Sequence, residues 1–429
     1  MPFAYELITE DVNIYNEPLP PPMPPIGPHT THLTLGDLHA NVIKLLFSLT
    51  RHGVISSPPL VYDRLVQLYR LPTYQHTKIS LQEFAYLIQL IKIQRTDLLI
   101  RLIGDETADR GQCDYFILLL LKQLRDNGIQ IEILFSNHGA EFILVLEYFI
   151  LNMAFYCPNH LEQYQSLRHL ESFFNQGFIP AQTLIELITL TYQPCLTLLS
   201  YDYDAHSLPQ SLTLYSHAPI DLSYIQHLAH TFRVSSNIQS AQGLSETLNH
   251  INRCFKDAVR SHNIHTLYDK QGVSASHRDY DKIYPFLNPK NVLISLVWNR
   301  VLTLNRDPIK IGFLIQFVHG HTTYDLTDHY DDTIIHSLDS DLGKQLWLNR
   351  GKHKALCAVF TPPIPQYTAQ SEDDLSMKRL PSSFELFPSS SEGSPLADAY
   401  HAPLFPRGEP PDPMELKQTQ SYRSLEDLA

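Results

Sequence analysis

This chain of 429 residues is short of cysteine and of positive charge, and each shortage excludes a class of protein. Its five cysteines never form a CxxC pair, so neither a disulfide framework nor a zinc knuckle is indicated, and a reducing compartment fits best. The 32 lysines and arginines stand against 45 acidic residues, which gives a net charge of -13. Binding nucleic acid by neutralising its phosphates requires a net basic face, so no nucleic-acid partner is expected.

Long apolar runs and export signals are also missing from the sequence. No run approaches the roughly 18 apolar residues that span a bilayer, so no transmembrane segment is expected. The opening residues, MPFAYELITEDV, contain no basic region followed by an apolar one, so no N-terminal signal peptide is predicted. With 43% hydrophobic and 10% aromatic residues, the composition predicts a globular protein with a substantial core.

Both ends of the chain differ in composition from its middle. Residues 1–30 are assigned to a Pro-rich N-terminal segment, because the prolines of PLPPPMPPIGP (18–28) cannot donate backbone hydrogen bonds. After residue 364, proline, serine and acidic residues are dense and apolar periodicity is lost, so 365–429 is predicted to be a disordered acidic tail. Residues 31–364 are predicted to form the folded domain.

Short apolar runs alternate with helical patterns in this middle part. Strands are predicted at 31–36, 98–104 and 129–137, with helices at 41–53 and 115–128 between them. Further strands are predicted at 195–200, 212–217, 291–298, 311–319, 333–338 and 354–360. Helical insertions are expected at about 54–97, 140–190 and 220–288. The predicted fold class is α/β, with a two-sheet β-sandwich flanked by helices.

Residue types that bind metals follow several of these strands. The segments are GDLH (36–39), GDETADRG (104–111), SNHG (136–139), LYSH (214–217) and VHGHT (318–322). Ligands of α/β sheets bind beyond the carboxyl ends of the strands, so these tips are expected to converge on one site. Carboxylate, imidazole and amide groups together suit a pair of divalent ions such as manganese, iron or zinc.

Each segment has an ordinary explanation when it is taken alone. Asp37 would more often cap the helix that follows it, and His39 would be a surface histidine. Asp109 and Arg110 would form an exposed ion pair in a turn. With 22 histidines in the chain, some fall at strand ends by chance. The ordered series of DxH, GDxxxDRG, NH and two strand-end histidines is hard to obtain by accident.

In this order the segments resemble the PPP class of metallophosphoesterases, whose signature is GDxHG, GDxxDRG with a variable spacer, GNHE and two later histidines. GDETADRG fits this signature closely, and LYSHAPI resembles the strand of the class that ends in His-Gly-Gly. LVWNR (296–300) resembles its Trp-plus-Arg segment, VHGHT its Gly-His-Thr segment, and HSLDSDLGK (336–344) its closing strand and turn. The resemblance covers about 31–360 and implies the calcineurin-like two-sheet fold.

The resemblance also implies a dinuclear metal site. Its ligands would be Asp37, His39 and Asp105 for the first ion, and Asp105, Asn137, His217 and His321 for the second. Asp105 would bridge the two ions, because each of its oxygens can face one of them. Manganese is the first choice of metal, with iron or zinc as alternatives. A water shared by the ions would lose a proton, and the resulting hydroxide would attack the phosphorus.

Roles in catalysis follow from the same resemblance. Arg110, Arg300 and Asn137 would bind the substrate phosphate. His138 would be the general acid that protonates the leaving oxygen, and Asp109 would orient it.

Three departures from the signature leave every implied ligand in place. Gly139 replaces the glutamate of GNHE, and Glu141 stands two positions later as an alternative to it. Ala40 replaces the last glycine of GDxHG, and Ala218 with Pro219 replaces the double glycine. An active enzyme is therefore favoured over a pseudophosphatase.

The predicted function is a metal-dependent protein phosphatase that hydrolyses phosphomonoesters of serine, threonine or tyrosine. One alternative is a hydrolase of dinucleoside polyphosphates or phosphodiesters, and another is a catalytically weak adaptor. The insertions and the acidic tail resemble the PPP-type phosphatases that intracellular bacteria inject into host cells, which implies a host phosphoprotein as substrate. Glu415, Glu426 and Asp427 would suit a type IV secretion signal, so translocation from the bacterial cytoplasm into a host cell is expected.

Overall fold

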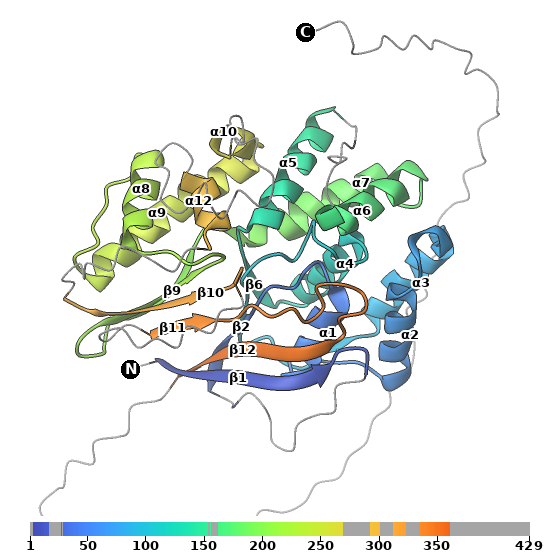
Figure 1. The fold of residues 1–429 in the computed structure, drawn as a ribbon, viewed down its shortest axis with the longest axis horizontal. Helices are drawn as coiled ribbons and strands as arrows, with labels where there is room; N and C mark the ends of the chain where they lie inside the picture. Colours follow the sequence, from blue (N-terminus) through green and yellow to red (C-terminus); the bar gives the residue numbers. More distant parts are fainter. Residues whose placement is uncertain are drawn as a thin grey trace, which may run out of the picture. The chain divides into compact units, whose positions relative to one another are not determined.

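Two β-sheets carry the strand ends at which the candidate site residues lie (Figure 1). This computed structural model describes residues 3–16, 27, 29–152, 155, 162–268, 292–300, 312–322 and 334–360, which belong to one compact unit, residues 1–366. Within these residues, the first sheet has the spatial order β1 (Phe3–Asn13), β12 (Arg350–Phe360), β2 (Thr30–Leu35), β5 (Leu99–Leu102), β6 (Gln130–Leu134) and β7 (Leu196–Thr197). The second has the order β11 (Ile334–Ser337), β10 (Leu314–His319), β9 (Ser211–Ser216) and β8 (Ser200–Asp204). A short pair joins β3 (Ile55–Ser56) and β4 (Lys92–Ile93).

Helices flank both sheets in the described part of the chain (Figure 1). The α-helices are α1 (Val42–Arg51), α2 (Pro59–Tyr69), α3 (Lys78–Gln89), α4 (Asp114–Asp126), α5 (Asn137–Asn152), α6 (Gln165–Asn175), α7 (Ala181–Glu186), α8 (Leu222–Thr231), α9 (Ala241–Arg260), α10 (Ile264–Leu267) and α12 (Val292–Trp298). Shorter helical turns are η1 (Thr73–Gln75), η2 (Glu162–Tyr164), the π-helical η3 (Leu187–Tyr192) and η4 (Gln193–Cys195).

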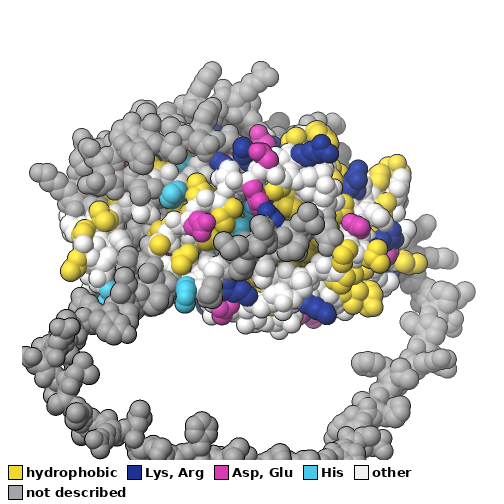
Figure 2. All heavy atoms as spheres, turned by 90° about the horizontal axis from the view of Figure 1, so that it is seen from below, with side chains coloured by type: hydrophobic (Ala, Val, Ile, Leu, Met, Phe, Trp, Pro, Cys, Tyr) yellow, Lys and Arg dark blue, Asp and Glu magenta, His cyan; other side chains and the backbone are white. Residues whose placement is uncertain are grey.

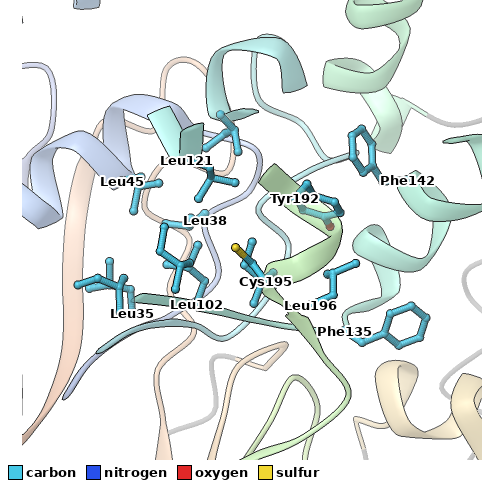
Figure 3. Close-up of a cluster of buried hydrophobic side chains, with 14 of the residues drawn as sticks. Leu35, Leu38, Leu45, Leu102, Leu121, Phe135, Phe142, Tyr192, Cys195 and Leu196 are labelled. Atoms are coloured by element: carbon cyan, nitrogen blue, oxygen red, sulfur yellow. The ribbon is translucent and has the colours of Figure 1, made fainter. Parts of the chain in front are cut away.

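The core beside the first sheet is built from leucines of strands and helices (Figure 3). Leu35 of β2 and Leu102 of β5 are partners in the parallel register, and both are buried. Leu45 of α1 and Leu121 of α4 belong to the same cluster. Asn41 caps α1, because its side chain accepts hydrogen bonds from two amides of the first turn. The alternation of strand and helix thereby holds the loops after β2 and β5 in fixed positions.

The strands that lead to the site run parallel within each sheet. β2, β5 and β6 are parallel neighbours in the first sheet, and β9, β10 and β11 in the second. One small apolar cluster contains residues of both sheets, namely Ile103, Leu134, Tyr215, Val318, Leu338 and Leu356. Parallel strands place their carboxyl ends at a common edge of each sheet, so the loops of both sheets can meet at one site.

The α/β fold with sheets flanked by helices is as predicted. The strands expected at 31–36, 98–104 and 129–137 are β2, β5 and β6, and the helices expected between them are α1 and α4. The intervals taken as insertions contain α2 and α3, then α6 and α7, then α8 and α9. Most of the Pro-rich stretch 18–28, residues 269–288 and the predicted tail 365–429 lie outside the described residues.

Two parts of the sequence interpretation are corrected by the structure. NVLISLVW (291–298) was predicted as a strand, but Val292–Trp298 is the helix α12, and all seven of its side chains are buried. A continuous apolar run has no periodicity that separates a buried strand from a buried helix. Phe3–Asn13, which was placed in a Pro-rich segment before the domain, forms β1 and pairs along its length with β12. The boundary at residue 31 therefore cuts off an edge strand of the first sheet.

Surface charge is mixed on the face shown in Figure 2. There, lysine and arginine side chains lie singly among acidic and apolar ones. Some large apolar side chains of the α2 to α3 region are exposed, among them Leu60, Tyr74 and Ile79. In the part of the chain that the structure describes, no helix is both long and apolar enough to cross a membrane.

A buried ion pair joins the two sheets. Arg101 of β5 donates to Asp202 of β8 over 3.0 Å, and both side chains are 1% exposed. The guanidinium of Arg101 lies 3.8 Å from the ring centroid of Tyr215, whose hydroxyl donates to Asp202 over 2.6 Å. Burial alone would raise the pKa of Asp202, but Arg101 and its other partners hold that pKa below its usual range. The buried ion pair stabilises the fold only while both Arg101 and Asp202 are present.

Replacing Arg101 with methionine is therefore expected to lower the free energy of unfolding by about 3 to 5 kcal/mol, because the buried carboxylate of Asp202 loses the guanidinium that balances its charge. Arg64→Met is the matched control: its pair with Glu83 is partly exposed and contributes less than about 1 kcal/mol. Urea unfolding at neutral pH measures the free energy of unfolding of both variants. The depressed pKa of Asp202 stabilises the wild type above about pH 4, and this stabilisation is lost as pH falls toward the folded pKa. Equal losses of stability from the two substitutions would contradict the role of Arg101 in balancing the buried charge of Asp202.

Candidate active site

Four predicted ligand atoms of the second ion converge around His217, which follows β9. His217 Nε2 lies 2.7 Å from Asn137 Oδ1, 3.2 Å from His321 Nδ1 and 3.5 Å from Asp105 Oδ1. All four side chains are buried. The group Asp105, His217 and His321 has ligand atoms within 4.8 Å of one another. These residues come from four separate strand ends, as the sequence analysis predicted.

Hydrogen bonding fixes which nitrogen of His217 faces this point. Its Nδ1 donates to the carbonyl of Ile103 over 3.1 Å, because a carbonyl can only accept. Burial lowers the pKa of His217, so the ring is neutral and Nε2 carries a lone pair. That lone pair is directed at the oxygens of Asn137 and Asp105. Atoms of this kind repel one another unless a cation lies between them, and a divalent ion is the expected one.

Asp37 joins the same site from the end of β2. Its Oδ2 accepts a hydrogen bond from the backbone amide of His321 over 2.9 Å. A Cβ atom at Gly320 would lie only 1.9 Å from Asp37 Oδ1, so a side chain cannot be accommodated there. Burial, followed by the nearby carboxylates of Asp339 and Asp105, raises the pKa of Asp37 well above its usual value. A bound cation would stabilise the carboxylate form of Asp37, which burial and the neighbouring carboxylates disfavour.

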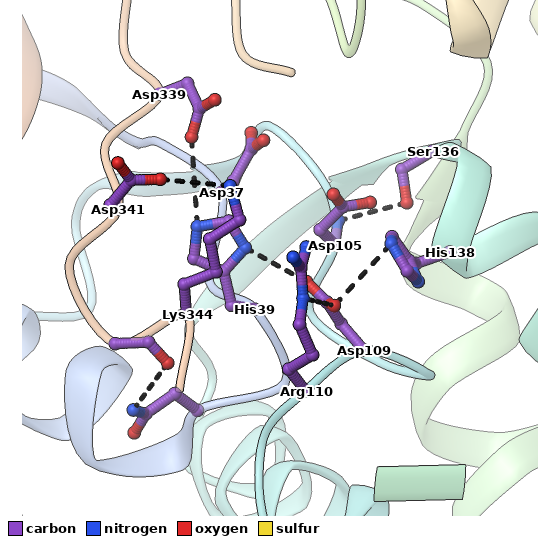
Figure 4. A network of polar contacts seen from close by, with 12 residues as sticks. Asp37, His39, Asp105, Asp109, Arg110, Ser136, His138, Asp339, Asp341 and Lys344 are labelled. Atoms are coloured by element: carbon purple, nitrogen blue, oxygen red, sulfur yellow. Dashed lines mark hydrogen bonds and ion pairs between the residues drawn. The ribbon is translucent and has the colours of Figure 1, made fainter. Parts of the chain in front are cut away.

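His39 lies at the site with both ring nitrogens facing protein acceptors (Figure 4). Its Nδ1 is 3.0 Å from Asp109 Oδ2, and its Nε2 donates to the carbonyl of Ser340 over 2.9 Å. His39 also groups with Asp105 and Asp109 as a possible metal-binding set. To bind an ion, one ring nitrogen of His39 must exchange its present acceptor for the metal.

Asp109 connects the proposed catalytic residues (Figure 4). Its Oδ1 accepts from Arg110 Nε over 2.7 Å and lies 3.6 Å from His138 Nε2. Burial would raise the pKa of Asp109, but His138, His39 and Arg110 outweigh it and hold the pKa well below the usual range. Asp109 is therefore a carboxylate, and it draws the side chain of Arg110 and the ring of His138 toward one point.

Arg300 lies two residues after the end of α12. Its side chain is exposed, and its positive charge contributes to lowering the pKa of His321, although burial is the larger cause. The ring of Trp298 meets His321 edge to face, with centroids 6.0 Å apart. Arg110 thus lies beside Asp109, and Arg300 is near enough for its charge to act on His321.

Unusual backbone conformations mark the turns after the strands. The non-glycine residues with φ between 50° and 60° include His39, Ala40, Asp105, Ala108 and His321. Left-handed conformations are costly for residues with a Cβ, and such outliers cluster at functional sites. Gly104 has φ 131°, and a Cβ there would lie 2.6 Å from His217 Nδ1. The backbone is thus bent sharply to bring the side chains together.

Comparison with known proteins agrees with this geometry. Residues 99–344, more than half of the chain, match the family described as WipA-like, phosphatase domain. The chain belongs to this WipA-like phosphatase family. A solved structure, the phosphatase domain of the Legionella effector WipB, is 30% identical with a TM-score of 0.60. The alignment covers 68% of this chain and 99% of the WipB domain. No curated protein matches the chain.

The WipA-like match covers only part of the candidate site. Asp105, His138 and His321 fall inside the matched residues, whereas Asp37 and His39 precede them. β2, which carries Asp37 to the site, is nevertheless hydrogen-bonded to β5 in the structure. The folded WipA-like phosphatase domain of this chain therefore also includes β2, which precedes the matched residues.

Two buried charged residues of this WipA-like site were missed by the sequence analysis. Asp339 follows β11, is 5% exposed, and has its Oδ1 3.8 Å from His39 Nε2. Lys44 lies in α1, and its Nζ donates to the carbonyl of Asp37 over 2.5 Å. Burial lowers the pKa of Lys44 to about 8, although Asp339 and Asp37 favour its charge. Asp339 could have been found from its strand-end position, and Lys44 from its place inside the apolar run NVIKLLF.

Gly139 stands where the PPP signature has glutamate, and other side chains occupy the space into which a side chain at this position would point. A Cβ at this position would be 3.0 Å from Ser136 Oγ, 3.5 Å from the hydroxyl of Tyr192 and 3.6 Å from Glu106 Oε1. The hydroxyl of Tyr192 donates to Glu106, which is fully buried. This WipA-like chain therefore holds a carboxyl group beside Gly139, but it comes from residue 106.

Proposed function

We propose that this chain is a protein phosphatase that works with two divalent ions. The observation that carries the proposal is the group of lone-pair atoms of Asp105, Asn137, His217 and His321 around one buried point. Buried atoms without a hydrogen-bond partner support it, namely Asp37 Oδ1, Asp105 Oδ1, His321 Nε2 and Asp339 Oδ1. Carboxylate, imidazole and amide donors suit manganese best, with iron or zinc as alternatives.

The proposed ions would be held by the residues that the PPP resemblance implies. Asp37, Asp105 and His39 would hold one, and His39 would turn a ring nitrogen away from its protein acceptor. Asp105, Asn137, His217 and His321 would hold the other. When bound, the pair would supply Lewis acidity and an activated water for attack on phosphorus.

The protein's own side chains would bind the phosphoryl group and handle the proton. Arg110 and Arg300 would each donate to phosphoryl oxygens. His138 Nδ1 donates to a backbone carbonyl, so the proton that it delivers to the leaving oxygen must come from Nε2. Asp109, which faces Nε2, would stabilise the imidazolium before transfer. Hydrolysis would then proceed without a phosphoenzyme.

A phosphorylated host protein is the substrate that we propose. The similarity to the phosphatase domain of an effector from Legionella supports this choice, because an effector acts after delivery into another cell. We likewise propose that the chain is translocated from a bacterium into its host. The domain is proposed to begin at β1, since that strand belongs to the first sheet.

Chelation and refilling test the proposed function. We expect the purified protein to hydrolyse p-nitrophenyl phosphate and phosphopeptides with Mn²⁺, and to lose activity at least about tenfold after metal removal. Dinucleoside tetraphosphate and bis(p-nitrophenyl) phosphate should be turned over more slowly. Faster turnover of those two compounds would favour the alternative hydrolase. Activity that survives complete metal removal would contradict the proposal, and so would absence of turnover with every metal.

A further inference from the structure

The backbone of Ala108 is held at its N–H and at its carbonyl by buried side chains. Its N–H donates to Asp114 Oδ1 over 2.9 Å, and its carbonyl accepts from His138 Nδ1 over 2.7 Å. Ala108 and Asp114 are fully buried, and His138 is 3% exposed. The N–H and the carbonyl belong to the two successive peptide groups that meet at the Ala108 Cα, so residue 108 connects Asp114 to the residue proposed as the general acid.

Ala108 stands where this chain has its own spacing. Three residues separate Asp105 from Asp109, one more than in GDxxDRG. Ala108, the last of the three, has φ 50°, a left-handed conformation that costs an alanine on the order of 1 kcal/mol or more. Such a conformation persists only when its surroundings hold it, and the hydrogen bond from the Ala108 N–H to Asp114 is one of the contacts that do so.

The insertion between β6 and β7 holds His138 and Asp109 from another side. The ring of Tyr164 meets the ring of His138 edge to face, with centroids 5.7 Å apart. The backbone amide of Ser166 donates to the carbonyl of Asp109 over 2.9 Å. Tyr164 and Ser166 are both buried. The insertion therefore contacts the catalytic turn directly, in addition to enlarging the helical layer.

We propose that Asp114, acting through the backbone of Ala108, and Tyr164, acting through its ring, are positioning residues that direct His138 Nε2 toward the leaving oxygen. This inference rests on the proposed role of His138 as general acid. With Nδ1 held by the Ala108 carbonyl, the ring can present only Nε2 to Asp109 and to the substrate. Neither residue touches the substrate; each acts through His138.

This role requires a hydrogen-bond acceptor at residue 114, and it does not require a charge there. Burial raises the pKa of Asp114 to about 7, although the hydroxyl of Ser166 and the N–H of Ala108 favour its charged form. Asp114→Asn keeps the oxygen that accepts from Ala108 and removes the carboxylate. Asp114→Ala removes the acceptor. The two substitutions therefore separate positioning from charge.

Leaving-group dependence provides the test. Phenyl phosphate needs its leaving oxygen protonated far more than p-nitrophenyl phosphate does, so loss of a well-placed acid slows the first substrate more. For Asp114→Ala we expect kcat on phenyl phosphate to fall about 10- to 100-fold and kcat on p-nitrophenyl phosphate by less than about threefold, with KM unchanged. Asp114→Asn should stay within about threefold of wild type on both. Tyr164→Leu should show the same selectivity as Asp114→Ala, and it carries the test if Asp114→Ala does not fold.

The outcomes separate this inference from the proposed function. If His138→Asn shows the selective loss but Asp114→Ala and Tyr164→Leu do not, the positioning role is wrong and the general acid stands. Equal loss on both substrates in Asp114→Ala and Tyr164→Leu would also overturn the positioning role, because that is the result of a general structural defect. If His138→Asn itself shows no selective loss, the proposed role of His138 fails first.

Discussion

Asp105→Asn is expected to lower kcat/KM for p-nitrophenyl phosphate by about 10³-fold or more. Asp105 lies in both candidate metal-binding groups, so its oxygens can serve two ions at once. An asparagine offers one neutral oxygen in place of two charged ones. Losing a Lewis acid that contributes several kcal/mol to transition-state stabilisation corresponds to a loss of this size.

Metal content and folding identify the cause of the Asp105→Asn effect. The variant should bind less than two equivalents of Mn²⁺ while keeping a cooperative thermal transition. Asp126→Asn is the matched control, because Asp126 is exposed and pairs with Lys122 on the surface of α4. We expect wild-type activity from this control. Near-normal activity of Asp105→Asn, with two ions still bound, would remove Asp105 from the proposed bridge.

His138→Asn is expected to reduce kcat on phenyl phosphate by about 10²- to 10⁴-fold, because it removes the only group that we assign to protonating the leaving oxygen. The loss on p-nitrophenyl phosphate should be clearly smaller. Metal content should stay at the wild-type value, since His138 is not a proposed ligand. This pattern is the opposite of that expected for Asp105→Asn, which affects metal binding and both substrates.

A histidine far from the turn provides the control for this prediction. His250 lies on the exposed face of α9, so His250→Asn should leave both rates unchanged. Steady-state rates of the two variants across pH 5 to 9 make the comparison. An equal loss on the two substrates in His138→Asn would assign His138 to phosphate binding or to the fold, and would leave the proton donor to be found elsewhere.

Much of the fold could be predicted because its strands and helices carry clear local patterns. In the first half, the apolar runs of β2, β5 and β6 alternate with the helical periodicities of α1 and α4. The run NVLISLVW shows the limit of that approach, because burial on all sides removes the periodicity that separates helix from strand. β1 escaped prediction for a different reason: it is an edge strand, rich in charged and exposed residues, next to prolines.

The candidate site could be predicted only as far as its residues occupy strand ends. Asn137, His217 and His321 were expected at one place, and the structure brings them together with Asp105. The orientation of His39 could not be inferred, because its acceptor at Ser340 lies 301 residues away in the sequence. The contact of Tyr164 with His138 also joins separate segments of the chain. Such contacts arise when separate segments pack together, so they cannot be predicted from any single stretch of the sequence.

The central claim is that Asp37, Asp105 and the residues around His217 hold two metal ions. Anomalous diffraction from crystals of the Mn²⁺-loaded protein, collected near the manganese absorption edge, tests it most directly. We predict two peaks about 3.5 to 4 Å apart, with Asp105 between them and His217 Nε2 at one of them. A single peak, or peaks away from these residues, would contradict the account.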